Sequence, residues 1–134
     1  MFVFNNNLCY YINVRVFKNT WFARFARKEG ISDEELREIV KQLEAGQADA
    51  DLGGDVYKVR LSRSGEGKAG GYRVIVFFRS EERTFFIYGF AKSDRGNIGQ
   101  KELRIFKDDA KDDFSLTDEQ ISDRIRKGTL IEVF

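Results

Sequence analysis

Two apolar runs, joined by a short polar turn, constrain the fold of this chain more than any other feature. The runs are VIVFF (residues 74–78) and TFFIYGF (residues 84–90), and the turn between them contains SEE (residues 80–82). Their β-branched and aromatic residues favour strands, and the short turn makes the two strands antiparallel neighbours. Because both runs are apolar on both faces, we expect central strands that helices cover on at least one side.

Further strands are predicted on either side of this pair. Residues 56–62 (VYKVRLS) predict the first strand of a three-stranded meander that continues through residues 71–79 and 83–91. Residues 10–17 (YYINVRVF) predict an N-terminal strand, and the tail TLIEVF predicts a short edge strand.

Capping residues and helical periodicity predict four helices. An αα-hairpin follows the N-terminal strand, and two more helices lie near the C-terminus. The hairpin consists of a helix over residues 20–28, capped by Asn19 or Thr20, and a helix from the Ser32–Glu35 capping box to Gly46. The C-terminal pair consists of a helix over residues 100–112 and a short helix from the Thr117–Gln120 capping box to Gly128.

These elements predict one α+β domain over residues 1–134. The N-terminal strand and the meander form a small antiparallel sheet, which packs against the αα-hairpin and carries additional C-terminal helices. A chain of 134 residues is expected to form a single core.

Composition excludes several classes of protein. The chain has no histidine and a single cysteine, Cys9. It therefore lacks an internal disulfide, the commonest metal ligand and the commonest base at neutral pH. No apolar run reaches the roughly 18 residues that span a bilayer, and the N-terminus lacks the layout of a signal peptide. We expect a cytoplasmic protein with no membrane contact, no metal and no small-molecule cofactor.

Charges are segregated along the chain. Glu66 is the only acid in residues 56–79, and Lys111 is the only base in residues 108–123. The basic centre predicts a surface for a polyanion, and the acidic region either stays solvated or shields that surface. Four aspartates of the acidic region form pairs with i,i+4 spacing. A solvated helix face explains this spacing more simply than a magnesium site does. The aspartates are Asp108, Asp109, Asp112 and Asp113.

Three basic residues of the meander form a candidate nucleic-acid site. Alternate strand residues share a face, so Lys58 and Arg60 project together about 6.6–6.8 Å apart, and hairpin pairing can bring Arg73 beside them. Phe77 continues the face of Arg73, and an exposed aromatic ring beside cations is a platform for single-stranded nucleic acid. An ordinary solvent-facing sheet also carries lysine and arginine, which is the alternative explanation.

The glycine-rich stretch RSGEGKAGGYR (residues 63–73) favours the binding interpretation. It predicts an eight-residue loop with four glycines, whereas a hairpin usually needs about two to five residues. Glycine permits close approach of the backbone to a ligand. We expect this loop, with Arg63 and Lys68, to close over a polyanion on the sheet.

Several motifs in fixed order carry a family resemblance. They are WFARFARKEGI (residues 21–31), DLGGDVYKVRL (51–61), GEGKAGGYRVIVFFR (65–79) and FFIYGFAKSDRGNI (85–98), followed by LTDEQI and LIEV. Together they resemble the RelE superfamily of toxins from bacterial type II toxin–antitoxin systems, most closely its HigB-type branch. The resemblance implies a RelE-like toxin domain in which residues 100–134 form an acidic helical region. Residues 1–13 lie outside it and are either an edge-strand extension or the product of a misassigned start.

The resemblance also implies a function. Such toxins are ribosome-dependent endoribonucleases that cleave mRNA without a metal, by attack of a ribose 2′-hydroxyl on the adjacent phosphate. The implied partners are a cognate antitoxin, of helix-turn-helix type for a HigB-like toxin, and mRNA on the ribosome. Two alternatives remain open: a non-catalytic RNA- or ribosome-binding protein, and a module whose main role is to bind the antitoxin.

The resemblance also implies which residues form the site, at the positions of this sequence that match the family's motifs. Arg60 stands where the family often has lysine, and arginine does not shuttle protons as lysine can. The family's C-terminal tyrosine has no secure counterpart. The implied catalytic set is Lys58, Arg60, Arg73 and Lys92, and the predicted RNA-binding set is Arg63, Lys68, Phe77, Arg79 and Arg95.

Overall fold

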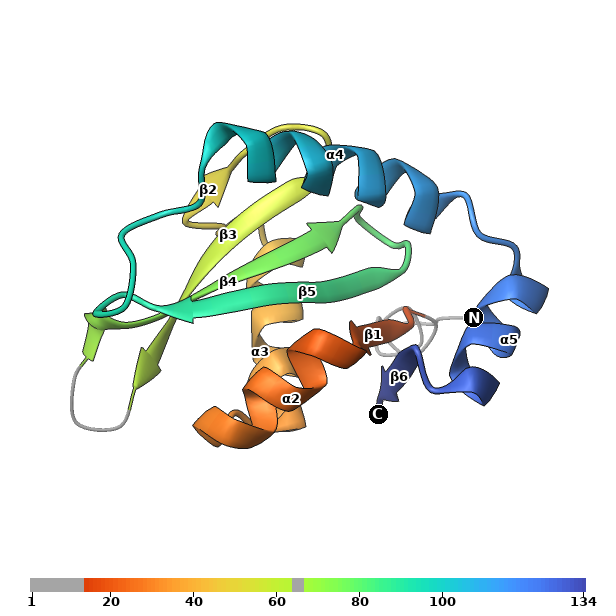
Figure 1. The fold of residues 1–134 in the computed structure, drawn as a ribbon, viewed down its shortest axis with the longest axis horizontal. Helices are drawn as coiled ribbons and strands as arrows, with labels where there is room; N and C mark the ends of the chain where they lie inside the picture. Colours follow the sequence, from red (N-terminus) through yellow and green to blue (C-terminus); the bar gives the residue numbers. More distant parts are fainter. Residues whose placement is uncertain (1–13, 64–66) are drawn as a thin grey trace.

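A six-stranded mixed sheet with helices on both faces forms the protein (Figure 1). The computed structural model describes residues 14–63 and 67–134, with the backbone alone for residues 63 and 67–70. The strand order is β2-β3-β4-β5-β1-β6. The elements are β1 (Val16–Asn19), α2 (Thr20–Glu29), α3 (Asp33–Glu44), β2 (Ala50–Asp51), β3 (Val56–Arg63), β4 (Gly67–Phe78), β5 (Thr84–Ala91), α4 (Gln100–Phe114), α5 (Asp118–Lys127) and β6 (Leu130–Val133).

The four predicted helix starts are confirmed, and side-chain caps open three of these helices. The side chain of Asn19 accepts a hydrogen bond from the backbone N–H of Phe22 and caps α2. Complete capping boxes open α3 and α5, formed by Ser32 with Glu35 and by Thr117 with Gln120. Each box satisfies backbone N–H groups that the first helical turn leaves without an intrahelical partner.

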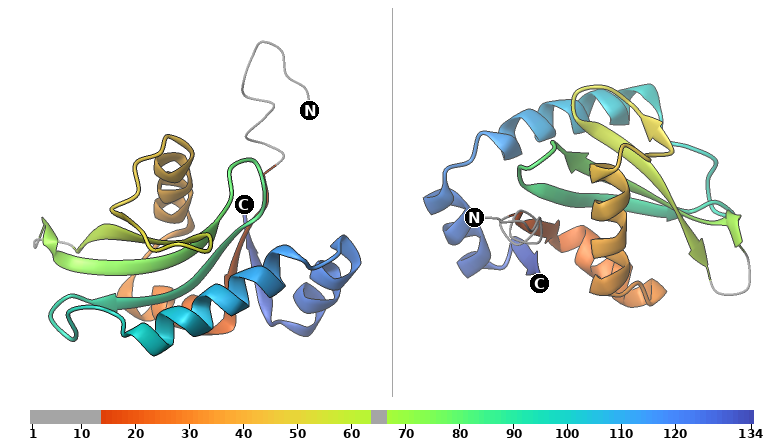
Figure 2. Two further views of the ribbon diagram at one scale, coloured as in Figure 1. Left: turned by 90° about the horizontal axis from the view of Figure 1, so that it is seen from above. Right: turned by 180° about the vertical axis from the view of Figure 1, so that it is seen from behind.

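Both faces of the sheet carry a core, as the two apolar runs predict. On one face, Phe22 of α2 and Leu36 of α3 pack with Val59, Val74 and Phe86 of the strands. On the other face, α4 and α5 cover a second cluster, which includes Phe17, Ile75, Phe77, Phe85, Ala110 and Ile121. Figure 2 shows α3 and α4 on opposite sides of the sheet. The α+β class and the helix-covered central strands are therefore confirmed.

The sheet contains pairings that periodicity alone does not predict. β1 pairs parallel with β5 and antiparallel with β6, so the sheet is mixed. The two-residue strand β2 pairs with β3 through Ala50↔Lys58 and Asp51↔Tyr57. Such pairings depend on long-range contacts rather than on local pattern. Among the described helices, none is long and apolar enough to cross a membrane.

The prediction of an eight-residue glycine loop is wrong. β4 begins at Gly67, so three of the four glycines lie in the strand, and Arg63 pairs with Gly67. The β3–β4 hairpin consequently projects beyond the end of β5 (Figure 1), whose pairing with β4 stops at Tyr72↔Ala91. Glycine disfavours strands only weakly, and pairing of the adjacent residues overrides that preference. Residues 64–66 and residues 1–13, which include Cys9 and the first half of the predicted N-terminal strand, lie outside the described residues.

Gly89 allows α2 to approach β5 closely. A Cβ atom at this position would lie 2.4 Å from Cε2 of Phe25, which is closer than non-bonded atoms tolerate. Phe25 in turn packs edge-on against Tyr72, with ring centroids 5.8 Å apart.

We therefore expect Gly89→Ala to displace Phe25 and lower the free energy of unfolding by roughly 1–3 kcal/mol, measured by urea denaturation. Gly96→Ala is the control, because its Cβ would meet nothing nearer than Nζ of Lys92 at 4.0 Å. Equal stability of the two variants would contradict the close packing.

Asp113, in the last turn of α4, gives folding a pH dependence. Burial, and then the neighbouring Asp109 and Asp112, raise the pKa of its carboxyl to about 6 from the usual 3.8, although Arg124 opposes the shift. A raised pKa means that the folded state binds this proton more tightly, so the stability it confers is present below about pH 4 and is lost as pH rises through 6.

Asp113→Asn should therefore raise the melting temperature at pH 7.5 and lose that advantage near pH 4. Because the side chain is partly exposed, we expect a gain of only about 1–2 kcal/mol at neutral pH, measured by thermal unfolding across this range. Asp108→Asn, on the exposed side of the same helix, should not reproduce the pH dependence. A stabilisation of Asp113→Asn that is constant with pH would contradict the assignment.

Candidate nucleic-acid interface

The β3–β4 register places three predicted cations on one face of the sheet. Arg60 lies directly opposite Arg73, and Lys58 lies opposite Ile75. Directly paired residues of an antiparallel ladder share a face, so Lys58, Arg60 and Arg73 project to the same side as Ile75. Ile75 belongs to the core cluster beneath α4 and α5. The three cations therefore lie on the α4 side, next to the projecting hairpin.

Arg60 and Arg73 form a cross-strand pair of like charges. The Cα atoms of such pairs are about 4.5–5.5 Å apart, and like charges placed directly opposite each other destabilise a sheet. Arg60 is exposed, whereas Arg73 is only 6 % exposed and donates from Nη1 to the carbonyl oxygen of Tyr72 at 3.3 Å. A guanidinium keeps its charge even when buried. The pair therefore places two positive charges at directly opposed positions of the sheet.

The segment after β5 brings further cations to the same side. The backbone N–H of Lys92 donates to the carbonyl oxygen of Gly71 at 2.9 Å, which fixes Lys92 beside β4, and its Nζ donates to the carbonyl oxygen of Gly96 at 3.3 Å. Asn97 directly contacts Lys58, one of the three cations Lys58, Arg60 and Arg73 that we call the triad. Its Oδ1 accepts from Nζ of Lys58 at 3.3 Å and from the backbone N–H of Ile98 at 2.9 Å.

Arg95 joins this segment to α4 and to two aromatic rings. Its guanidinium donates from Nη2 to Oε1 of Glu102 at 2.6 Å and from Nη1 to the hydroxyl of Tyr88 at 3.2 Å. It also lies 5.4 Å from the ring centroid of Phe90, the residue paired with Arg73. Arg95 is therefore adjacent to the triad, as the RNA-binding prediction requires, although an acid already engages it.

The Arg95–Glu102 ion pair shifts the pKa of each partner in the direction that favours its charged form. Hydrogen bonds from Arg95, and then from the backbone N–H of Gly99, lower the pKa of Glu102, while Glu102 raises the pKa of Arg95. Glu102 is the third residue of α4, where a carboxylate also interacts favourably with the helix dipole. The pair thus ties the 92–99 segment to the start of α4.

We expect the Glu102 carboxyl to titrate below the ordinary glutamate range, and its pKa to rise toward that range in Arg95→Ala because the main hydrogen bond is lost. The measurement is the pH dependence of the side-chain carboxyl ¹³C shift by NMR. Arg126→Ala, which removes another surface arginine that is ion-paired elsewhere, is the control. An unchanged Glu102 titration in Arg95→Ala would show that the pair does not form in solution.

Two predicted RNA-binding residues are misplaced for that role. Phe77 is fully buried and packs edge-on against Phe106 of α4, so its ring cannot stack on a base. Arg79 lies at the opposite end of β4, about 20 Å along the strand from Arg73, and pairs with Asp55 at 2.9 Å. The prediction for Phe77 is wrong because α4 covers its ring. Arg79 lies too far from Lys58, Arg60 and Arg73 to share one site with them. The side chains of Arg63 and Lys68 lie outside the described residues.

Four residues that sequence reasoning did not select contribute to this surface. They are Trp21, Tyr88, Asn97 and Glu102. Only Glu102 carries a sequence signal, because a glutamate three residues after Gly99 is typical of a helix N-terminus. The other three are recognisable only once α2, β5 and the 92–99 segment are seen together.

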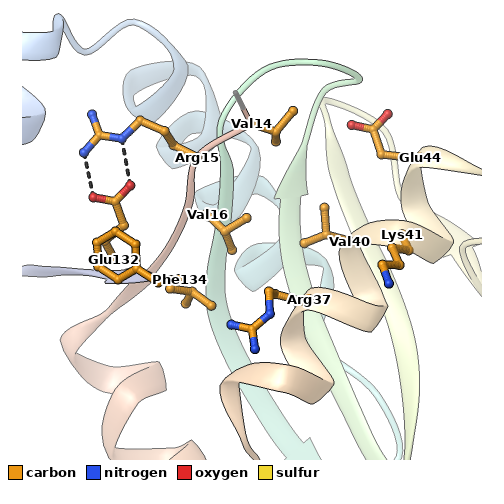
Figure 3. A pocket seen from close by; sticks show the side chains of 10 residues that line it. Val14, Arg15, Val16, Arg37, Val40, Lys41, Glu44, Glu132 and Phe134 are labelled. Carbon is orange, nitrogen blue, oxygen red and sulfur yellow. Dashed lines mark hydrogen bonds and ion pairs between the residues drawn. The ribbon is translucent and has the colours of Figure 1, made fainter. Parts of the chain in front are cut away.

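A groove on the other face of the sheet is separate from this interface. It has a volume of about 390 Å³ and lies between α3 and the strands β1 and β6 (Figure 3). Val16, Val40 and Val133 line it, and the Arg15–Glu132 ion pair, 2.7 Å long, borders it. Because these valines belong to the α2–α3 core cluster, the groove does not adjoin the basic residues.

The fold and the basic face together define a small α+β protein with a cationic site on an open end of its sheet. A family model described as the RelE toxin of the RelE/RelB toxin–antitoxin system matches residues 14–133. Since this match covers nearly the whole chain, the protein belongs to the RelE toxin family. Membership makes it the toxin of a toxin–antitoxin pair and implies a cognate antitoxin as its partner.

Proposed function

We propose that this toxin is a ribosome-dependent endoribonuclease of the HigB-type branch, which cleaves mRNA by attack of a ribose 2′-hydroxyl on the adjacent phosphate. The observation that carries the proposal is the convergence of Lys58, Arg60 and Arg73 on one face, with Arg60 and Arg73 directly opposite each other. Such a pair suits the two non-bridging oxygens of one phosphate, because arginine binds phosphate through a planar fork of donors.

The reaction requires little covalent chemistry from the protein. The 2′-oxygen forms a bond to phosphorus while the bond from phosphorus to the 5′-oxygen breaks, which yields a 2′,3′-cyclic phosphate and a 5′-hydroxyl end. The 2′-hydroxyl gives one proton to solvent water, and the leaving 5′-oxygen takes one from an ammonium group of the site, which solvent then reprotonates. Because the nucleophile belongs to the substrate, the site must supply alignment and positive charge at the phosphate. The absence of histidine from the sequence is therefore compatible with this reaction.

The three cations take different roles in this proposal. Arg60 and Arg73 bind the phosphate and stabilise the charge that builds on it in the transition state. Lys58 is the proton-transfer residue, because an ammonium can donate to the leaving oxygen and an arginine cannot. Asn97, through its hydrogen bond to Nζ of Lys58, holds that ammonium in place. Lys92 adds charge where the RNA leaves the sheet.

The proposed partners follow from the same reasoning. The substrate is mRNA positioned by the ribosome, and the antitoxin is of helix-turn-helix type, as the HigB-like motifs suggest. The site of action is the cytoplasm. The family match supports the toxin role, and the basic face supports an RNA substrate.

Removal of either arginine should abolish toxicity. We expect Arg60→Ala and Arg73→Ala each to reduce ribosome-dependent cleavage by about 10²–10³-fold, since each removes a cation from the phosphate. The measurements are growth inhibition on induction and mapping of new mRNA 5′ ends.

Arg79→Ala is the matched control, an arginine directly after the same strand that pairs with Asp55 far from the site. Because Arg73 is buried, circular dichroism must show that its variant is folded, and the exposed Arg60 gives an independent test. Full cleavage by both folded variants would refute the catalytic assignment. Salt-sensitive ribosome binding without new 5′ ends in the unmodified protein would instead identify a non-catalytic binding protein.

A further inference from the structure

We propose that Trp21 is a stacking platform for a nucleobase of the bound RNA, next to the phosphate site. This inference rests on the proposed function, because it needs RNA on the same surface. Trp21 is 42 % exposed, and the other large hydrophobic side chains exposed in the described part of the chain are Ile105 and Phe134. Trp21 is thus the exposed member of an aromatic cluster in which Phe25 and Tyr88 are half-buried and Phe90 is buried.

A continuous path of contacts joins Trp21 to the triad. The Trp21 ring lies 4.5 Å from that of Tyr88, centroid to centroid, and Tyr88 lies 6.1 Å from Phe90. Phe90 is paired with Arg73 across the sheet. The guanidinium of Arg95 lies over both intervening rings, 6.0 Å from Tyr88 and 5.4 Å from Phe90. A strand of RNA that leaves the phosphate site along this path passes a cation and then an exposed indole.

The position of Trp21 is fixed before any ligand binds. It lies in the first turn of α2, which runs beside β5 (Figure 1). Asn19, the cap of that helix, donates from Nδ2 to the carbonyl oxygen of Ile87 at 3.2 Å and so fastens the turn to the edge of β5. Phe25, one turn further along, stacks on Trp21 with ring centroids 5.4 Å apart. A rigid aromatic side chain loses little conformational entropy on binding.

The Trp21 ring is not what packs α2 onto the core. α2 is anchored by Phe22, Ala23 and Ala26, which are buried. Arg24 lies three residues after Trp21 and is also exposed, so both side chains share one side of the helix. An exposed aromatic ring with cations on either side is the arrangement that binds single-stranded nucleic acid by stacking and phosphate neutralisation.

The sequence offers a direct measurement, because Trp21 is the only tryptophan. We expect its fluorescence to be quenched when the protein is titrated with a single-stranded 2′-O-methyl oligoribonucleotide, which lacks the attacking hydroxyl. Inorganic polyphosphate, which carries the charge without bases, should bind without comparable quenching. The anisotropy of a labelled oligonucleotide reports binding independently of the indole.

Variants separate stacking from packing. Trp21→Leu should weaken oligonucleotide binding roughly tenfold, and Trp21→Phe should retain most of the affinity because it keeps an aromatic face. Ile105→Ala, at another exposed hydrophobic position, should leave the affinity unchanged. Thermal unfolding of each variant shows whether its fold is preserved.

The outcomes are distinguishable. Oligonucleotide binding without quenching, or with full affinity in Trp21→Leu, overturns the stacking role and leaves the phosphate site intact. Quenching by polyphosphate equal to that by the oligonucleotide also overturns it, because the signal would then report charge alone. Absence of any anisotropy change with the unmodified protein overturns both this inference and RNA binding by the basic face.

Discussion

The pairing of β3 with β4 is the interaction on which the site depends. It places Arg60 directly opposite Arg73 and Lys58 opposite Ile75, so that three cations from two strands share one face. A shift of this register by one residue would turn Lys58 and Arg60 toward the core of α2 and α3. The apolar residues between the cations set the register, because Val59, Val74 and Val76 must all be buried beneath α2 and α3. The core of the other face therefore positions the functional side chains.

The helix α4 decides which part of that face is functional. It buries Phe77 and covers the half of the sheet toward Arg79, and it leaves the half toward the hairpin to the cations. The Arg95–Glu102 pair fastens the start of α4 to the segment that carries Lys92 and Asn97. The sheet thus has two separate surfaces, the cationic face beside α4 and the apolar groove between α3 and the β1–β6 edge (Figure 3).

Local signals in the sequence predicted much of this architecture, and tertiary contacts decided the rest. The Ser32–Glu35 and Thr117–Gln120 boxes and the alternation in residues 56–62 depend on near neighbours, so they were interpreted correctly. The same alternation placed Lys58 and Arg60 together. Phe77 was judged exposed because no local pattern reveals which stretch of a sheet a distant helix will cover. Trp21 was not selected as a site residue for the converse reason, since its exposure depends on where β1 ends and where α2 lies beside β5.

The central claim is that Arg60 and Arg73 act on one scissile phosphate, and a double-mutant cycle on kcat/KM for ribosome-dependent cleavage tests it most directly. Residues that act as a unit show strongly non-additive losses. The account predicts that the Arg60→Ala/Arg73→Ala double variant loses little more activity than the more damaged single variant. Losses that multiply, as for two independent sites, would contradict it.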